Sequence, residues 1–308
     1  MKKVLLTGAS GFIGRYTIPI LLGKGIEVHA VFYPLPIASE KHRNLIWHKC
    51  NLLDSKKQSE LMKKIRPDYL LHLAWYTIPG SYWDSTENIR WLQASLGLIL
   101  NFFQNKGKRA VAAGSCAEYD WNFGHCHEEK TPLRPSTLYG ICKKNLYETI
   151  EYFSRQRKFS FAWGRIFSTY GPYEHTKRLI PSLIISLLKR KPFACTHGRQ
   201  IRDFLYVQDV AEAFVALLDS KIDGPVNIAS GRSIALKTLI NYIARQLGHP
   251  ELISFGKIIA SPEEPLSLTA ELTRITEEVG WKPKHGLEEG LALTINWWKD
   301  FLKNKNKQ

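Results

Sequence analysis

The segment KVLLTGASGFIG at residues 3–14 decides the fold, because a short apolar run passes directly into a loop with three glycines. Gly8, Gly11 and Gly14 are spaced three residues apart, and the following sequence predicts a helix over 14–25. Glycines let a tight turn bring the backbone close to a pyrophosphate, and a helix N-terminus supplies unpaired N–H groups. A strand, a glycine loop and a helix in this order predict a dinucleotide-binding unit rather than a plain turn.

Short apolar runs alternate with longer helical patterns through the first two-thirds of the chain. Strands are predicted at 3–9, 27–33, 45–50, 69–75, 109–115 and 160–167, with helices at 14–25, 57–65, 88–107 and 136–156. This alternation favours a parallel sheet covered by helices on both faces. Later helices are predicted at 179–190, 207–220 and 236–248, between short extended pieces.

We therefore predict an α/β fold with two parts. Residues 1–170 are expected to form a Rossmann-type domain with a doubly wound parallel sheet. Residues 171–308 are expected to form mostly a smaller C-terminal α/β substrate-binding lobe, with some segments returning to the first domain. No internal repeat and no low-complexity linker separates the two parts.

The composition points to a cytoplasmic globular protein. The 308 residues are 44% hydrophobic, which is enough for a full core, and no apolar run is long enough to span a membrane. The first apolar run enters the glycine loop directly, so we expect no signal peptide. The five cysteines are scattered without a C-x-x-C pair, which favours a reducing compartment over a disulfide framework.

The formal net charge of +15 has two interpretations. A clustered basic face would favour a nucleic-acid partner, whereas dispersed charge fits a small anionic substrate. The basic residues are spread along the chain, and the one sharp run is the tail KDFLKNKNKQ at 299–308. We therefore expect no nucleic-acid partner and no membrane association.

Tyr139 and Lys143 stand four residues apart within TLYGICKKN at 137–145, so a helix would place both on one face. The pattern alone is weak, because a chain with 43 Lys and Arg residues and 13 tyrosines forms such pairs by chance. The chemistry makes the pair useful, since a neighbouring ammonium favours the phenolate form of a tyrosine. Such a tyrosine could transfer a proton near neutral pH.

Several further motifs occur in an order that resembles the extended short-chain dehydrogenase/reductase family, which contains nucleotide-sugar epimerases, dehydratases and reductases. They are TGASGFIG (7–14), LLHLAW (70–75), AGSCAEY (113–119), GRIFSTYGP (164–172), RQIRDFLYVQDVAEA (199–213), VNIASG (226–231) and GWKPKHGLEEGL (280–291). The last two match the C-terminal lobe of the family. The resemblance runs from residue 4 to about residue 299.

The resemblance implies roles for individual residues. Tyr139 would be the catalytic acid or base, Lys143 would tune it and bind the nicotinamide ribose, and Ser115 would hold the substrate oxygen. An NAD(P) cofactor would be bound by Gly8, Ser10, Gly11, Phe12, Ile13, Gly14, Asn51, Leu52, Leu73, Ala74, Tyr139 and Lys143. A nucleotide-diphosphate sugar would be bound by Trp75, Ser115, Ser168 and Arg202, with the arginine fork clamping the diphosphate.

The resemblance also implies a homodimer. The predicted helices at 88–107 and 136–156 resemble the pair that forms a four-helix bundle between subunits in this family. Trp83 and Trp91 are expected to serve core or subunit packing, whereas Trp75 is expected to wall the sugar pocket. The segment HCHEE at 125–129 is expected to be a polar loop and not a metal site.

The sequence departs from the family pattern after Ser115. The dehydratases carry Asp-Glu there, and this chain has Cys116 and Ala117. Glu118 comes one residue late, and in an extended segment it would point to the opposite face. We therefore expect no dehydration, and Cys116 stays open as an alternative proton donor.

Other departures concern the cofactor and the substrate. Tyr33 stands where an acidic residue would grip the adenosine ribose of NAD, and Lys41 and Arg43 could meet a 2′-phosphate. Because Glu40 is also near, NADP(H) is favoured only slightly over NAD(H). Asn51 replaces the usual aspartate that contacts adenine. Ser168 replaces a frequent substrate-binding asparagine, which implies altered contacts around the sugar or diphosphate.

The sequence thus predicts hydride transfer at C4 of a nucleotide sugar. The first expectation is a 4-keto-6-deoxysugar reductase in deoxysugar or surface-polysaccharide biosynthesis. An NDP-sugar 4-epimerase with a recycled NAD is the alternative within the family. A non-catalytic dinucleotide sensor or RNA-binding family member is the alternative from another class, and the net charge is its one support.

Overall fold

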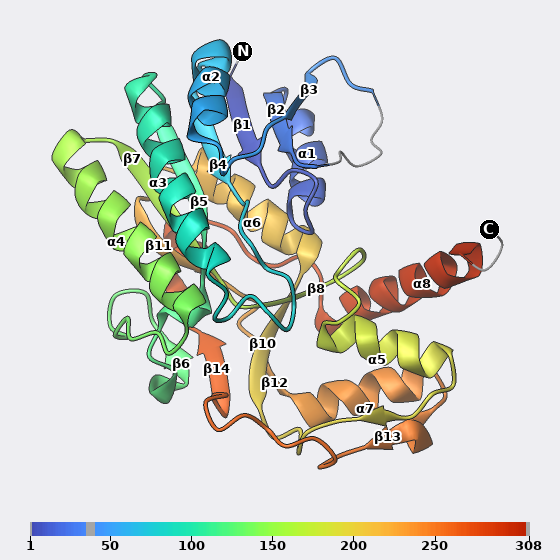
Figure 1. Ribbon diagram of the computed structural model, residues 1–308. Coiled ribbons are helices and arrows are strands. Elements are labelled where there is room, and N and C mark those ends of the chain that lie inside the picture. The colour runs from blue at the N-terminus through green and yellow to red at the C-terminus, as the bar shows by residue number, and fades with distance from the viewer. Residues whose placement is uncertain (1, 35–40, 306–308) are drawn as a thin grey trace.

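Seven parallel strands form the large sheet of the computed structural model, which describes residues 2–34 and 41–305 (Figure 1). In spatial order they are β11 (Gly224–Ile228), β7 (Ser160–Ile166), β5 (Arg109–Ser115), β4 (Tyr69–His72), β1 (Lys3–Thr7), β2 (Glu27–Phe32) and β3 (Leu45–Lys49). The chain begins at β1 in the interior of the sheet and winds outward in both directions. This confirms the predicted doubly wound, Rossmann-type sheet.

Helices cover both faces of this sheet, as Figure 1 shows. Those on one face are α1 (Gly14–Gly23) and α6 (Val207–Asp219), and those on the other are α2 (Ser55–Ile65), α3 (Glu87–Gln104) and α4 (Leu138–Arg157). Both faces are therefore removed from water, which explains why the first strand is an uninterrupted apolar run.

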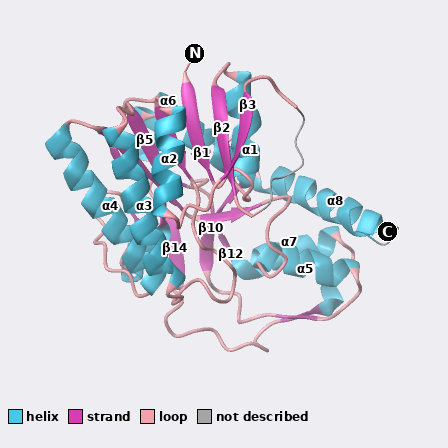
Figure 2. Ribbon diagram, turned by 45° about the horizontal axis from the view of Figure 1, so that its top comes forward, coloured by secondary structure: helices cyan, strands magenta, loops and turns pink. Residues whose placement is uncertain are grey.

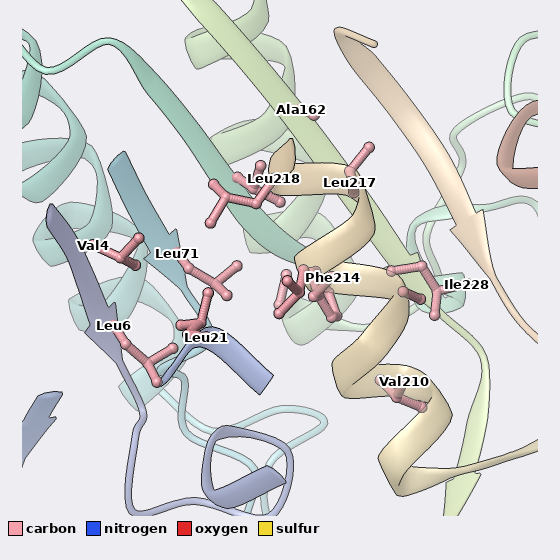
Figure 3. Packing of buried hydrophobic residues seen from close by; sticks show 14 of the residues in the cluster. Val4, Leu6, Leu21, Leu71, Ala162, Val210, Phe214, Leu217, Leu218 and Ile228 are labelled. Atoms are coloured by element: carbon pink, nitrogen blue, oxygen red, sulfur yellow. The ribbon is translucent and has the colours of Figure 1, made fainter. Parts of the chain in front are cut away.

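Successive residues of β1 serve opposite layers of the core. Val4 and Leu6 pack toward α1 and α6, together with Leu21 and Phe214 (Figure 3). Leu5 lies between them in the chain and joins the cluster beneath α2, α3 and α4. The alternation follows from the two-residue period of a strand, and it fixes the register of β1 between β2 and β4.

The edge strand β11 differs from the sequence-based expectation. The segment VNIASG was assigned to the C-terminal lobe, but its first three residues belong to β11, which pairs in parallel with β7. The preceding helix α6 packs against α1 and carries the chain back to the large sheet. Pro225 is tolerated because this strand lies at the edge, where a missing N–H can face outward.

A second sheet and three helices make up the smaller part (Figure 2). The sheet contains β12 (Ser233–Ala235), β10 (Ile201–Tyr206), β14 (Ser267–Ala270), β6 (His125–Cys126) and β8 (Ser168–Tyr170). The helices are α5 (Leu179–Leu188), α7 (Leu236–Gln246) and α8 (Leu287–Lys305), packed around Leu183, Leu239 and Trp298. A short pair joins β9 (Phe193–Ala194) and β13 (Ile253–Ser254).

The chain crosses between the two parts several times. β6 comes before residue 170 and lies in the second sheet, whereas α6 and β11 come after it and lie with the large sheet. The division into residues 1–170 and a mostly separate lobe at 171–308, with some segments returning, stays a prediction. Within the described ranges, no helix combines the length and the apolar character that crossing a membrane requires.

Candidate active site

The carboxyl ends of β1 and β4 form the point from which the large sheet winds in opposite directions. The two strands are neighbours, but β1 continues into α1 on one face and β4 leads to α3 on the other. In open α/β sheets, ligands bind in the crevice that such a reversal opens. The glycine loop at 8–14 lies at this position.

The glycines are required by the geometry of the loop. Gly8 has φ +68°, and a Cβ added to it would lie 2.9 Å from backbone atoms of Leu73 and Ala74. A Cβ added to Gly14 would lie 2.1 Å from the Gly8 carbonyl oxygen. The Gly11 N–H donates to that same oxygen at 2.9 Å and closes the turn. The loop and the end of β4 thus form a cradle that a side chain would fill, and it fits a pyrophosphate.

The other predicted cofactor residues lie along the same edge of the sheet. Ser10 offers its carbonyl oxygen to Arg15, and Phe12 and Ile13 are partly buried where α1 begins. Asn51 and Leu52 follow β3, and the Asn51 side chain accepts a hydrogen bond from the Leu53 N–H at 3.1 Å.

Replacing Gly14 with alanine is expected to weaken dinucleotide binding at least about tenfold, because the added methyl group cannot fit beside the Gly8 carbonyl. Isothermal titration with NADPH and with NADH measures the effect. Gly23→Ala is the matched control, since a Cβ at this end of the same helix has no atom within 4 Å. Equal affinity in both variants would show that the cradle does not hold the dinucleotide.

The three predicted catalytic residues converge beside this crevice. Ser115 ends β5, while Tyr139 and Lys143 lie in the first turns of α4. The Thr137 side chain caps that helix by accepting from the Gly140 N–H at 3.1 Å, which sets where the first turn begins. Ser115, Tyr139 and Lys143 are buried, and the Ser115 hydroxyl is near enough to Tyr139 to influence the pKa of its phenol.

Lys143 occupies an environment that disfavours its charge. Its Nζ donates to the Ala113 carbonyl oxygen at 2.8 Å and lies 3.8 Å from the ring centroid of Trp75. Burial lowers the pKa of Lys143 to about 7, and the nearby Glu118 carboxylate acts in the opposite direction. The lysine can therefore change its charge near neutral pH.

A lowered Tyr139 pKa is expected beside Lys143 and the positive ring of a bound cofactor, whereas in the chain alone the pKa shifts in the opposite direction. Burial raises the pKa of Tyr139, Tyr82 raises it further, and the nearby Ser115 hydroxyl lowers it only partly. The Lys143 Nζ lies 6.0 Å from the centroid of the Tyr139 ring, and its attraction does not outweigh the loss of water around a phenolate. The buried tyrosine is therefore a neutral phenol, which can donate a proton.

An aromatic enclosure surrounds the Tyr139 ring. Tyr82, Trp83 and Trp75 present their rings nearly perpendicular to it, with centroids at 5.0, 5.8 and 6.5 Å. The Tyr139 N–H also donates to the Trp83 carbonyl oxygen at 2.8 Å. Trp83 is 37% exposed, so it does not belong to the core, and the expected alternative of subunit packing stays a prediction.

Glu118 belongs to a buried ion pair and not to the reacting side of the site. Residues 116–118 form a 3₁₀ turn, so the expectation of an extended segment is wrong. The Glu118 carboxylate pairs with the Arg165 guanidinium at 2.7 Å and accepts hydrogen bonds from Trp163 Nε1 and the Ser115 N–H. These partners occupy the carboxylate, which leaves it unsuited to remove a proton from a sugar.

Cys116 directly follows Ser115, the last residue of β5. Burial raises the pKa of the Cys116 thiol to about 12, so the group stays protonated. Arg202 is close enough to act against this shift. The role of the thiol as a proton donor stays a hypothesis.

The remaining predicted substrate contacts come from the smaller part. Ser168 is partly buried where β8 begins, and Arg202 lies on β10. The Arg202 Nη2 pairs with Glu264 at 3.0 Å, and Nη1 donates to the Ile201 carbonyl oxygen at 2.8 Å. One of the nitrogens intended for a diphosphate therefore already has an acidic partner.

The residues named for NADP selection lie beyond β2. Tyr33, Lys41 and Arg43 are exposed, and Glu40 lies outside the described residues.

In the segment 125–129, His125 contacts Thr269 and Glu271. Across residues 2–34 and 41–305, no three His, Cys, Asp or Glu side chains converge as metal ligands would.

A second buried carboxyl near the site was missed by the sequence analysis. Glu174 follows β8, is 9% exposed, and its Oε2 has no hydrogen-bond partner among the described residues. Burial raises the pKa of Glu174 to about 8, against the pull of Arg178. Arg178 in turn reaches the Tyr82 hydroxyl at 3.5 Å. Nothing in the pattern YGPYEH distinguishes this glutamate from an exposed loop residue.

A cavity of about 960 Å³ lies elsewhere, between the outer side of α4 and the strands β7 and β11. Its lining includes Lys144, Glu151 and Arg165 but none of the predicted site residues. The candidate site is therefore defined by convergent side chains and not by the size of an empty space.

A doubly wound sheet, a glycine cradle where the winding reverses, and a buried Ser–Tyr–Lys group together characterise the extended short-chain dehydrogenases/reductases. The comparison with known families agrees. The chain belongs to the NAD dependent epimerase/dehydratase family, whose model matches residues 4–229. It is therefore an enzyme of a family that acts on nucleotide sugars with a nicotinamide cofactor.

Individual relatives are similar over most of their length. UDP-glucuronic acid decarboxylase 1 of Xenopus tropicalis is 25% identical over 99% of this chain and 74% of its own. CDP-abequose synthase of Salmonella typhimurium is 26% identical over 94% of this chain and 96% of its own. The structure of MoeE5 in complex with UDP-glucose and NAD is 28% identical, with a TM-score of 0.83, over 97% of this chain and 99% of its own.

Proposed function

We propose that the chain is an NAD(P)-dependent reductase that acts at C4 of a nucleotide 4-keto-6-deoxysugar. The observation that carries the proposal is Tyr139, buried close to Ser115 and Lys143, where burial raises the pKa of the phenol and so favours its protonated form. Reduction of a ketone needs a proton donor at the oxygen that becomes a hydroxyl, and a neutral phenol serves this purpose.

Each catalytic residue has one task in this proposal. Ser115 holds the sugar carbonyl oxygen, and Tyr139 donates its proton to that oxygen. The Lys143 ammonium stabilises the phenolate that remains, because an opposite charge nearby favours the ionised form. A bound reduced nicotinamide supplies the hydride.

Two observations support a nucleotide-diphosphate sugar as the substrate. MoeE5 was solved with UDP-glucose and NAD, and the relatives named above carry UDP- or CDP-sugars in their names. In this chain, Arg202 on β10 would contact the diphosphate after exchanging Glu264 for it. Lys41 and Arg43 beyond β2 favour NADP(H) slightly, because they could meet a 2′-phosphate.

Dehydration is disfavoured by the same geometry. Proton abstraction from a sugar carbon needs an available carboxylate, and Glu118 is fully buried in its ion pair with Arg165.

A 4-epimerase with a recycled NAD is the second candidate, since one Tyr–Lys pair can serve oxidation and reduction in turn. The membership in an enzyme family and the intact Tyr139–Lys143 pair argue against a non-catalytic or RNA-binding role.

Cofactor consumption separates the two candidates. The absorbance of the purified protein at the reduced-nicotinamide band is recorded first, and NADPH is then added with a panel of nucleotide 4-keto-6-deoxysugars. The reductase consumes one NADPH for each sugar. A tightly held NAD with no net consumption, but with interconversion of NDP-hexoses at C4, would establish the epimerase instead. Inertness toward every sugar would remove both.

The rate of reduction is expected to fall as the pH rises through about 7, where Lys143 loses its proton. The Tyr139 phenol stays protonated over this range, because burial raises its pKa. The lost charge is therefore that of the lysine, and the phenolate product of proton donation becomes less stable. Single-turnover rates between pH 6 and 9 measure the profile, and a rate that rises over this range would contradict the assignment.

We also propose a homodimer through α3 and α4. Ile89 and Leu100 are exposed on α3, and Ile141 and Tyr152 are exposed on α4. Each pair is eleven residues apart, which places its two members on one helix face. Two copies of this helix pair would bury these side chains in a four-helix bundle. Sedimentation equilibrium of the wild type and of Leu100→Glu tests the assembly, because a buried carboxylate would dissociate it.

A further inference from the structure

Trp75 contacts both members of the catalytic pair. The Lys143 Nζ lies 3.8 Å from the centroid of its ring, and the Tyr139 ring stands against it at 6.5 Å with an angle of 79° between the planes. The other aromatic rings near the ammonium are those of Tyr139 at 6.0 Å and Trp163 at 5.8 Å. Among the described residues, the indole of Trp75 is thus the face on which the ammonium rests.

The indole is itself held in one orientation. Its Nε1 donates to Asn88 Oδ1 at 2.9 Å, and Asn88 is fully buried at the start of α3. The Asn88 side-chain amide donates to the carbonyl oxygens of Tyr82 at 2.6 Å and Ser85 at 3.0 Å. One asparagine therefore fixes both the indole and the loop that carries Tyr82 over the Tyr139 ring.

The charged groups that face Lys143 do not replace this contact. Glu118 attracts the ammonium but is already paired with Arg165. His72 is bonded to Thr7 at 2.7 Å and Ser95 at 2.9 Å, and burial lowers its pKa to about 3, so it brings no positive charge. Beyond these groups, the ammonium has the Ala113 carbonyl oxygen and the π face of Trp75.

We propose that Trp75 is a positioning residue, whose π face holds the Lys143 ammonium in place beside Tyr139. The negative face of an indole attracts a cation most strongly where water is excluded, as it is here. This inference rests on the proposed function, because it assumes that Lys143 serves Tyr139. It assigns to Trp75 a role that differs from a wall of the sugar pocket.

The sign of a pKa change separates the two roles. If the π face holds the ammonium, weakening that face lowers the pKa of Lys143 below about 7. If Trp75 only excludes water, replacing it with a smaller residue admits water and raises the pKa of Lys143 toward its ordinary value. The two roles therefore predict opposite shifts for the same group.

The sharpest variant changes the electrostatics of the indole without removing it. Tetrafluorotryptophan, placed at position 75 by amber suppression, keeps the ring system but weakens its negative face. Carbon-13 NMR of labelled lysine side chains follows the titration of Lys143, whose signal is assigned by its loss in Lys143→Met. We expect the midpoint to fall by about one pH unit.

Three substitutions complete the test. Trp75→Leu removes the π face and is expected to lower the titration midpoint of Lys143. Trp75→Phe keeps a smaller π face, so its Lys143 midpoint is expected to lie close to that of the wild type. Trp91→Leu is the matched control, because Trp91 packs on Trp75 at 6.3 Å without facing the ammonium. It is expected to leave the midpoint unchanged. Circular dichroism establishes that each variant is folded.

The catalytic activity is expected to change together with the Lys143 midpoint. In the fluorinated and leucine variants, we expect kcat to fall about tenfold with KM for the sugar unchanged, and the alkaline limb of the pH profile to move to lower pH. An unchanged or raised Lys143 midpoint in the fluorinated protein would overturn the positioning role. That outcome is distinguishable from a failure of the proposed function, which is measured separately by NADPH consumption with the nucleotide 4-keto-6-deoxysugars.

Discussion

Replacing Tyr139 with phenylalanine is expected to lower the rate of hydride transfer by about 10²- to 10⁴-fold, the range that a positioned proton donor contributes. The phenylalanine ring keeps the packing against Tyr82, Trp83 and Trp75, so the fold should be unchanged. The lost hydroxyl leaves the substrate oxygen without its proton donor. Single-turnover oxidation of NADPH at saturating sugar measures the loss.

The control for this substitution lies on the same helix. Tyr152 is 69% exposed on α4, so Tyr152→Phe removes a tyrosine hydroxyl without touching the site. We expect wild-type rates for this variant. Tyr139→Phe should still bind NADPH, because the glycine cradle is formed by backbone atoms that the substitution leaves in place. A Tyr139→Phe enzyme within threefold of the wild-type rate would end the assignment of Tyr139 as the proton donor.

Replacing Arg165 with methionine is expected to lower the free energy of unfolding by about 3–5 kcal/mol, because it leaves the Glu118 carboxylate buried without its ionic partner. Both side chains are fully buried, and their contact is 2.7 Å. Arg165 also donates to the Tyr119 hydroxyl at 3.1 Å, and this bond is lost as well. Urea unfolding of the wild type and the variant measures the difference.

An exposed pair serves as the matched control. Arg155 pairs with Glu151 on α4 at 2.6 Å, but its side chain is 74% exposed. Arg155→Met should cost less than about 1 kcal/mol, because water and salt screen such a pair. Combining Arg165→Met with Glu118→Gln should recover part of the lost stability, since no unpaired charge is left. Equal costs for Arg155→Met and Arg165→Met would contradict the buried pair.

The fold was predictable where local pattern and geometry agree. The alternating strands and helices predicted the large sheet, and Gly8 and Gly14 occupy positions where the backbone of another segment leaves no room for a side chain. Lys143 follows Tyr139 by one helical turn, which sequence spacing specifies directly. These features depend on contacts that are close along the chain or on one residue type.

The rest of the site depends on contacts that are distant in the sequence. Glu118 is neutralised by Arg165, 47 residues later, and no spacing rule links them. Trp83, which packs against the Tyr139 ring, stands more than fifty residues earlier in the sequence. No local pattern links the two residues, so Trp83 was assigned to core or subunit packing. Burial by these rings also raised the pKa of Tyr139, whereas the sequence indicated only the neighbouring lysine. For the same reason, β11 could not be assigned to a sheet from its own five residues.

The central claim is that this site transfers a hydride to C4 of a nucleotide sugar, with Tyr139 supplying the proton. The most direct measurement follows deuterium from each of the two C4-labelled forms of NADPH into the sugar by mass spectrometry and NMR. We predict that one of the two forms delivers one deuterium per turnover to C4 and the other delivers none, with no transfer by Tyr139→Phe. A product without deuterium from either form, or with deuterium at another carbon, would contradict the account.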